Sequence, residues 1–346
     1  MSKKRIVVVC PGRGSYTKEN LGYLSQRKEI QNDLTLVDSL RSQLNEPTIS
    51  DLDNAKVFKT SLHTKGEHAS PLIYTCSLAD YLSIDQNKFE VVAITGNSMG
   101  WYLALGFSQA LSRENSFHLI QTMGSMMKSQ LIGGQIIYPL IDENWIMDQR
   151  KESLVSDLIA EGNSKKDCEV YLSISLGGYA VIAGNQQGLN FMAEKLPPIE
   201  HYPFKLINHG AFHTPMMNEV SKKAFEQIPI HHFEKPKIPL IDGRGKIWQP
   251  FSTITEELYE YTLNHQVCKT YDFTKSISTA LKEFAPDHLV LLGPGNSLGG
   301  AIGQTLIKNS WKGLDSKESF SSLQKQDPFL ISMGMKLQKQ VLQAQL

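Results

Sequence analysis

The sequence lacks a net charge and is poor in cysteine. Among its 346 residues, 35 lysines and arginines balance 35 aspartates and glutamates. A dedicated nucleic-acid-binding protein normally has a basic excess, so this balance argues against a nucleic-acid partner. The four cysteines, at positions 10, 76, 168 and 268, form no CxxC pair and are too few and scattered for a disulfide scaffold. We therefore expect reduced thiols and no bound metal.

The start of the chain has no long hydrophobic run. The basic residues 3–5 are followed by the apolar run 6–10, which ends at Pro11-Gly12. A secretory signal needs about 7–15 apolar residues, and a membrane-spanning helix needs about 20. We therefore expect a cytoplasmic protein with no membrane contact.

Apolar runs and helical patterns alternate along most of the chain. Runs typical of buried parallel strands occupy residues 6–10, 91–95, 238–241 and 288–292. Helical patterns separate them, and the pattern over residues 71–82 predicts a helix with Pro71 near its first turn. This alternation predicts an α/β fold in which helices cover both faces of a large parallel sheet.

The alternation changes between residues 133 and 207. Strand patterns at 135–140, 169–174, 179–184 and 201–207 enclose helical patterns at 148–162 and 187–196. This β-α-β-β-α-β order fits a small ferredoxin-like insert. We predict a large domain of residues 1–132 and 208–313, an insert of residues 133–207, and a peripheral helical C-terminal extension of residues 314–346.

A Gly-x-Ser-x-Gly pattern lies between a predicted strand and a predicted helix. Gly96-Asn97-Ser98-Met99-Gly100 follows the apolar run 91–95 and precedes the helical run 101–105. This is the nucleophile-elbow pattern of α/β-hydrolase-like folds. The glycines relieve crowding at a sharp turn, and the serine meets a helix N-terminus, where free N–H groups favour negative charge. Ser98 is therefore a candidate nucleophile.

A serine nucleophile needs a base that removes its proton, and the chain has ten histidines. His213 stands out because it lies in the small-residue loop 210–215, before a helix that begins at Pro215. A histidine on such a loop can project into a cleft. The local sequence alone nevertheless favours a surface or helix-capping role, and His209 is the nearest competitor.

Collinear motifs within residues 6–310 resemble those of the malonyl-CoA:acyl carrier protein transacylases and of the acyltransferase domains of fatty acid and polyketide synthases. They are the loop Pro11-Gly12-Arg13-Gly14-Ser15, the helix segment 70–79, the elbow 96–100, the base loop 211–217, Gln266 with the later Phe273-Thr274-Lys275-Ser276, and the turn 293–298. Each match alone is weak. Their shared order favours this family and makes His213 the favoured base.

The resemblance implies an acyl carrier protein S-acyltransferase on a large α/β-hydrolase-like domain. Ser98 attacks an acyl-CoA thioester with His213 as base, and the acyl-serine passes its acyl group to the phosphopantetheine thiol of a carrier protein. By the same resemblance, a backbone carbonyl mapped to Gln266 orients the histidine, and the N–H groups of Arg13 and Met99 hold the oxyanion. Acyl-CoA and acyl carrier protein are the implied partners, and no bound cofactor or metal is implied.

The sequence departs from this family where the acyl group is expected. Malonyl-using members have an arginine that pairs with the free carboxylate, and here Met123 occupies that position. A thioether cannot neutralise a carboxylate, so the direct interpretation is a pocket for a neutral acyl group, acetyl or longer. Arg13, in place of the loop glutamine, either recognises the carboxylate instead or points to solvent or to the donor's phosphates. Malonyl therefore stays an alternative.

Trp101 replaces the glutamate that usually follows the elbow, and we expect its bulk near the mouth of the cleft. Two other functions stay open. An acyl-thioester hydrolase on the same scaffold would release the acyl group of Ser98 to water. A non-catalytic binding protein of a synthase complex would form no acyl adduct, although the presence of both Ser98 and His213 argues against it.

Overall fold

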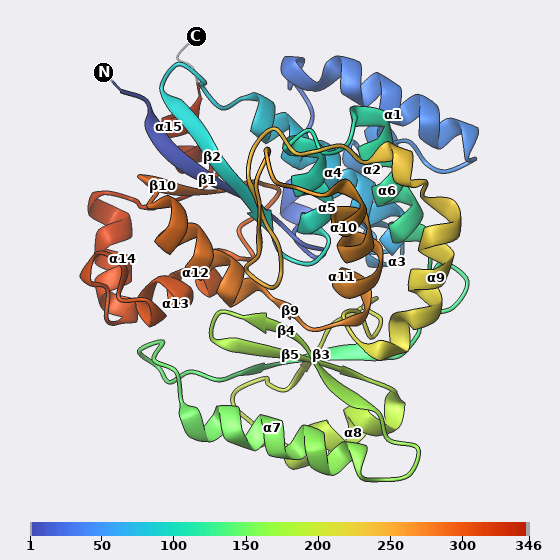
Figure 1. Cartoon of the computed structure of the whole chain (residues 1–346), viewed down its shortest axis with the longest axis vertical. Helices are drawn as coiled ribbons and strands as arrows, with labels where there is room; N and C mark the ends of the chain where they lie inside the picture. The colour runs from blue at the N-terminus through green and yellow to red at the C-terminus, as the bar shows by residue number, and fades with distance from the viewer. Residues whose placement is uncertain (1, 344–346) are drawn as a thin grey trace.

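The main sheet confirms the predicted α/β class. The computed structural model describes residues 2–343. Within them, a six-stranded sheet has the order β11-β10-β1-β2-β7-β8 and is parallel except at β8. Figure 1 shows β10, β1 and β2 of this sheet. Its strands are β1 (Lys4–Cys10), β2 (Phe89–Gly96), β7 (Leu240–Ile241), β8 (Ile247–Trp248), β10 (His288–Leu291) and β11 (Leu330–Ser332). The apolar residues of β1 are fully buried, as expected for a strand covered on both faces.

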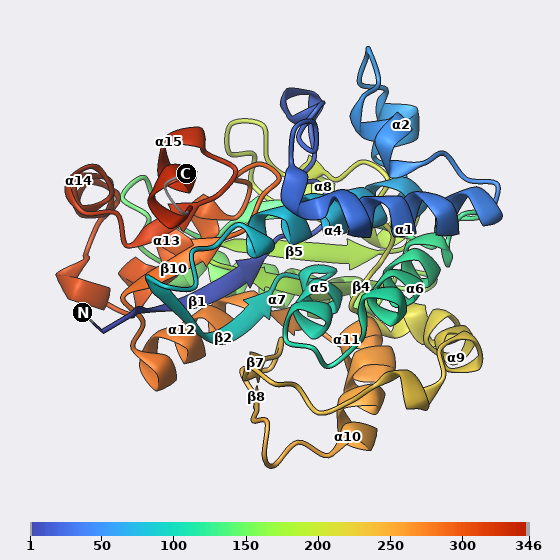
Figure 2. The ribbon, with the colours of Figure 1, turned by 90° about the horizontal axis from the view of Figure 1, so that it is seen from above.

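Helices surround this sheet, and α5 and α12 both pack on β2. Figure 2 shows α1, α4 and α6 at one end of the view and α13 and α14 at the other, with β1 and β2 between them. The helices are α1 (Gln31–Gln43), α2 (Ile49–Asp53), α3 (Thr60–His63), α4 (Gly66–Leu82), α5 (Gly100–Phe107), α6 (Arg113–Ser125), α9 (Asn218–Gln227), α10 (Thr255–Glu260), α11 (Gln266–Cys268), α12 (Phe273–Phe284), α13 (Gly299–Lys308), α14 (Lys317–Gln326) and α15 (Lys336–Leu342). A π-helical turn, η5 (Tyr261–His265), joins α10 to α11, and a 3-10 turn, η3 (Pro215–Met217), precedes α9.

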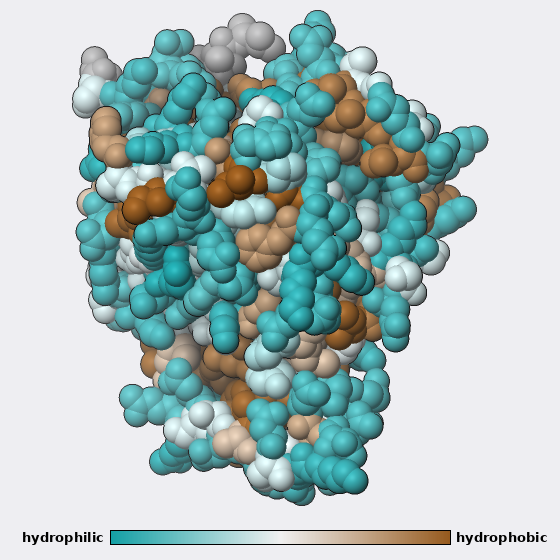
Figure 3. Space-filling model, turned by 45° about the vertical axis from the view of Figure 1, so that its right-hand side comes forward, coloured by the Kyte–Doolittle hydropathy of each residue, from teal (hydrophilic) through white to brown (hydrophobic). Residues whose placement is uncertain are grey.

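A second sheet lies below the first in Figure 1 and carries two helices on its far face. Its order is β6-β3-β5-β4-β9. Its elements are β3 (Gly134–Pro139), α7 (Gln149–Asn163), β4 (Val170–Leu176), β5 (Tyr179–Gly184), α8 (Gln186–Lys195), β6 (Phe204–Lys205) and β9 (Tyr271–Asp272). Strand β9 comes from outside residues 133–207 and pairs in parallel with β4. Apolar side chains gather where the part of the molecule built on the main sheet meets the part built on the second sheet (Figure 3).

Pro71 lies inside α4, so the prediction that it stands near the first turn was wrong. Proline has no N–H, so the carbonyl four residues earlier, that of Glu67, loses its helical partner. This carbonyl instead accepts hydrogen bonds from Arg41 Nη1 at 2.8 Å and Gln121 Nε2 at 3.4 Å. Side chains of α1 and α6 thus donate hydrogen bonds to the carbonyl that Pro71 leaves without a helical partner, and these bonds hold α4 against both helices. The partners are distant in the sequence, so local patterns do not reveal them.

The C-terminal segment is not only a peripheral helical extension. Leu330–Ser332 forms β11, which pairs in parallel with β10 at the edge of the main sheet. The apolar residues 329–331 and 333 are buried, and this short run is easily overlooked among the polar residues around it. Residues 344–346 of the predicted extension lie outside the described residues. Between residues 2 and 343, none of the helices combines the length and the apolarity needed to cross a bilayer.

Candidate active site

Ser98 stands at the turn between β2 and α5. Its φ is 56°, in the left-handed region that L-residues rarely adopt. The flanking glycines make the turn possible: a Cβ at Gly96 would lie 2.3 Å from the Gly100 carbonyl carbon, and a Cβ at Gly100 would lie 2.4 Å from the Cys10 carbonyl oxygen. The two positions therefore need glycine because of space. This packing directs the serine hydroxyl into a cavity.

His213 is the histidine that the structure brings to Ser98. The Ser98 Oγ and His213 Nε2 atoms are 2.7 Å apart, although the residues are 115 positions apart in the sequence. The His213 Nδ1–H group donates to the Gln266 carbonyl at 2.5 Å, so Nε2 carries the lone pair that can accept the serine proton. The His213 backbone N–H donates to the Val267 carbonyl at 3.0 Å. The start of α11 therefore holds both the backbone and the ring of the histidine.

Burial lowers the pKa of His213 to about 4, and the hydrogen bond to the Gln266 carbonyl opposes this lowering. We therefore expect the rate of acylation of Ser98 to rise with pH through about 4 and to be constant from mildly acidic to neutral pH, because only neutral imidazole accepts the proton. The measurement is single-turnover acylation by an acyl-CoA as a function of pH, with circular dichroism at each pH as a control for folding. A midpoint at the ordinary histidine pKa, about 6.5, would contradict this expectation.

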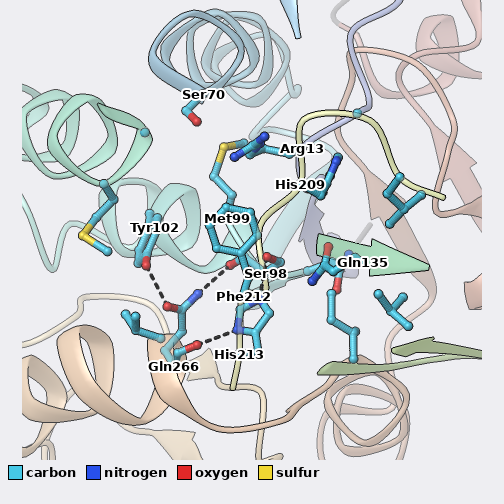
Figure 4. A pocket seen from close by; sticks show the side chains of 18 of the residues that line it. Arg13, Ser70, Ser98, Met99, Tyr102, Gln135, His209, Phe212, His213 and Gln266 are labelled. Atoms are coloured by element: carbon cyan, nitrogen blue, oxygen red, sulfur yellow. Dashed lines mark hydrogen bonds between the residues drawn. The ribbon is translucent and has the colours of Figure 1, made fainter. Parts of the chain in front are cut away.

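The Gln266 side chain makes a second set of contacts that the sequence did not reveal. Its Nε2 donates to the Ser98 carbonyl at 3.1 Å, and its Oε1 accepts from the Tyr102 hydroxyl at 2.7 Å (Figure 4). Gln266 thus holds the elbow through its side chain and the histidine through its carbonyl. Tyr102 lies on α5, one helical turn after Ser98, and nothing in its local sequence signals this role.

The two predicted oxyanion donors flank the nucleophile. Arg13 and Met99 both line the cavity that contains Ser98. Among residues 2–343, neither backbone N–H has a hydrogen-bond acceptor. The loop of Arg13 approaches the elbow so closely that a Cβ at Gly12 would lie 2.9 Å from the Asn97 carbonyl oxygen. Two unpaired N–H groups beside a nucleophile can stabilise an oxyanion.

The Arg13 side chain faces the cavity and does not point to bulk solvent. One Nη2–H donates to the Asn208 carbonyl. The guanidinium lies over the Phe212 ring, with its Cζ atom 5.1 Å from the centre of the ring. A Cβ built at Gly66 would lie 3.2 Å from Arg13 Nη1 and 2.4 Å from the Gly124 carbonyl oxygen, so the guanidinium lies beside the segment Met123-Gly124. Burial lowers the pKa of Arg13 to about 10, while Glu67 opposes this. Arg13 makes no ion pair within 4.0 Å in the described part of the chain.

The cavity has a volume of about 290 Å³. Its lining is mostly apolar, and much of it comes from α6, the turn after α6 and the second sheet, with Ile120, Met123, Met126, Met127, Ile137 and Val181 as examples. Polar groups are fewer, and two of them, Gln135 and His209, face the cavity together with Arg13. The sequence did not single out Gln135, and His209 was considered only as a competing base. In Figure 4, these two lie to one side of Ser98, and Tyr102 and Gln266 lie to the other.

Trp101 does not stand at the mouth of the cleft, and this prediction was wrong. Its side chain is fully buried, its Nε1–H donates to Thr262 Oγ1 at 3.0 Å, and its ring packs edge-on against Tyr261. Every residue of α5 is buried, so the helix has no polar face that could have indicated its orientation. No group of three or more His, Cys, Asp or Glu side chains in residues 2–343 is arranged to hold a metal.

Comparison with known proteins agrees with this fold. No family model matches the chain. The malonyl CoA-acyl carrier protein transacylase of Bacillus subtilis is 22% identical over 305 residues, which cover 86% of this chain and 89% of that protein. The solved malonyl-CoA:ACP transacylase of Synechocystis superposes with a TM-score of 0.74 at 16% identity, covering 98% of this chain and 100% of that one. The acyl-carrier-protein S-malonyltransferase of Burkholderia pseudomallei gives a TM-score of 0.73 at 17% identity, covering 97% and 98%.

The solved transacylases have the same fold as this chain, and the relative matched in sequence is also named a transacylase. The chain resembles the malonyl-CoA:acyl carrier protein transacylases in sequence and has their fold over almost its whole length, so the resemblance drawn from the motifs is confirmed.

Proposed function

We propose that the protein is an acyl carrier protein S-acyltransferase that moves an acyl group from CoA to the phosphopantetheine thiol of a carrier protein through an acyl-Ser98 intermediate. The observation that carries this proposal is the chain of contacts from Ser98 Oγ to His213 Nε2 at 2.7 Å and from His213 Nδ1 to the Gln266 carbonyl at 2.5 Å. It supplies a nucleophile, its base and the group that orients the base. The relatives named as transacylases support the same assignment.

The reaction has two half-reactions, acylation of Ser98 and transfer of the acyl group to the carrier. The Ser98 hydroxyl proton passes to His213 Nε2 as Oγ attacks the thioester carbonyl, and the N–H groups of Met99 and Arg13 bind the oxyanion. The C–S bond then breaks, and the leaving CoA thiolate takes the proton from His213. In the second half, the pantetheine thiol gives its proton to His213 and attacks the ester, and the proton returns to Ser98 Oγ. CoA and carrier protein thus react in turn at one site.

The acyl group is proposed to carry a carboxylate that Arg13 binds. Met123 offers no charge. The Arg13 guanidinium, however, lies beside the Met123-Gly124 segment, and the resemblance places the carboxylate of the acyl group at this segment. Its Nη1 has no acceptor among the described residues, and burial without a direct counter-ion destabilises the cation. A malonyl carboxylate would supply the missing counter-ion.

We expect Arg13→Ala to lower the ratio of malonyl-CoA to acetyl-CoA acylation rates about 100-fold, the size of a hydrogen bond between charged groups. Single-turnover acylation, read by intact mass, gives both rates. Arg150→Ala, which removes an exposed arginine on α7, is the matched control. A wild-type preference for acetyl or longer neutral chains that survives Arg13→Ala would remove the role of Arg13. It would support the second candidate, a neutral acyl group in the apolar cavity beside Met123.

One experiment tests the reaction class. Acyl-CoA donors are incubated with the protein, and the mass of the chain is followed with and without a carrier protein bearing phosphopantetheine. An adduct on Ser98 that persists until the carrier is added supports transfer. Rapid loss of the adduct to water supports an acyl-thioester hydrolase. Absence of an adduct with every donor supports a non-catalytic binding protein and overturns the proposal.

A further inference from the structure

Gln135 is a fixed hydrogen-bond acceptor in the wall of the cavity. Its side chain is 2% exposed, and its Nε2–H donates to Ser173 Oγ at 2.7 Å. The single proton of the Ser173 hydroxyl is donated to the Phe212 carbonyl at 2.8 Å, so Ser173 must accept from the carboxamide. This fixes which end of the amide is nitrogen. The Oε1 atom has no donor within residues 2–343, and the residue lines the cavity.

His209 supplies a second acceptor close by. Its Nδ1–H donates to the Ile207 carbonyl at 2.8 Å, which leaves the lone pair on Nε2. Burial, and then Arg13, lower the pKa of His209 to about 4, so the ring is neutral at neutral pH. The chain around His209 runs beside the start of β3, since the Leu206 N–H donates to the Gln135 carbonyl at 3.0 Å and the Ala211 N–H to the Ile132 carbonyl at 2.7 Å. Gln135 and His209 therefore share one wall.

Two neutral acceptors without donors, on one wall of a mostly apolar cavity, indicate a ligand with neutral N–H or O–H groups. We infer that Gln135 Oε1 and His209 Nε2 accept the two amide N–H groups of the pantetheine arm, with Gln135 bound to the amide nearer the thioester. This inference rests on the proposed function. It assigns two positioning residues that hold the arm while Ser98 reacts.

The chemistry of the arm favours this assignment. CoA and a carrier protein present the same arm, so one pair of acceptors serves both halves of the reaction. The first amide nitrogen is separated from the sulfur by only two carbons, so this N–H must lie near Ser98 when the thioester is attacked. The second amide lies farther along the arm. The two acceptors differ in burial in the way that this order of the amides requires. Gln135, assigned to the amide nearer the thioester, is buried, and His209, assigned to the second amide, is half-buried.

The test uses synthetic acyl thioesters that differ by one N–H group. The N-acetylcysteamine thioester contains the first amide, and the 4-oxopentyl thioester of the same acyl group replaces only its N–H with CH2. We expect wild-type Ser98 to be acylated about tenfold faster by the first than by the second, the size of one hydrogen bond to a buried acceptor. A ratio of one with measurable adduct overturns the inference while leaving the proposed function intact. Absence of adduct from every thioester overturns both.

Variants assign each acceptor. We expect Gln135→Leu to bring this ratio close to one, and Ser173→Ala, which frees the carboxamide to rotate, to lower it by about threefold. The exposed Gln149 on α7 gives the matched control Gln149→Leu, for which the ratio should stay at the wild-type value. A tenfold ratio that survives both cavity variants would show that another group accepts the N–H, and would overturn the assignment.

The role of His209 as an acceptor is tested with the second amide of the pantetheine arm. Pantetheine thioesters are compared with analogues in which only the second amide N–H is replaced by CH2. We expect His209→Leu to remove the wild-type preference for the intact arm and to leave the ratio at the first amide near tenfold, whereas Gln135→Leu should show the opposite pattern. If His209→Leu changes neither ratio, the role of His209 is wrong.

Discussion

Acylation of the protein by a thioester is expected to disappear in Ser98→Ala and to slow by about 10 000-fold in His213→Ala. In the first variant no oxygen remains to form the ester. In the second, no base stands 2.7 Å from the serine oxygen, and the hydroxyl must attack with its proton in place. Intact mass after incubation with an acyl-CoA reports the first variant, and stopped-flow release of CoA reports the second.

The control for both variants is His231→Ala, which removes an exposed histidine that does not line the cavity. It should form adduct at the wild-type rate. An adduct in Ser98→Ala would show that another side chain is the nucleophile. A loss of less than about tenfold in His213→Ala would show that a different base acts, and the mechanism would have to be revised.

Asp80 is a position where a single substitution should cost much of the stability. Its carboxylate is fully buried and accepts four hydrogen bonds, from Tyr23 Oη at 2.6 Å, Arg27 Nη1 at 3.0 Å, Lys339 Nζ at 2.6 Å and the Gly293 N–H at 2.8 Å. We expect Asp80→Ala to lower the free energy of unfolding by about 3–5 kcal/mol, because two cations lose their shared counter-ion in a buried site. Urea denaturation followed by circular dichroism measures this loss.

Two further variants make the stability measurement specific. Asp157→Ala removes an exposed carboxylate of α7 and should change the free energy of unfolding by less than about 0.5 kcal/mol. Lys339→Met removes one of the two cations and should cost less than Asp80→Ala, because Arg27 still neutralises the carboxylate. A loss below about 1 kcal/mol in Asp80→Ala would mean that solvent reaches the cluster.

The parts of the fold and site that the sequence predicts are the ones encoded by contiguous residues. The strand-turn-helix order around Ser98 and the small-residue loop of His213 are local patterns, and the structure places these two side chains in contact. The roles given to them remain predictions. What the sequence did not reveal depends on tertiary contacts between distant segments. The Gln266 side chain reaches Tyr102 across 164 positions, and no periodicity records such a contact.

The failed predictions have the same origin. The orientation of Trp101 could not be inferred, because α5 is buried on every side and its pattern favours no direction. The β11 strand was missed because it has only three residues, and it is stabilised by pairing with β10 and not by its own propensity. Pro71 was misplaced because the groups that replace its missing hydrogen bond come from α1 and α6.

The backbone at the two reacting residues has a consequence for any attempt to stabilise this molecule. Both Ser98 and His213 have positive φ values, 56° and 59°, and glycine would adopt this conformation with less strain. Glycine at either position would also remove the reacting atom. Laboratory selection for thermal tolerance alone would therefore favour inert chains, and any such selection must include a requirement for turnover.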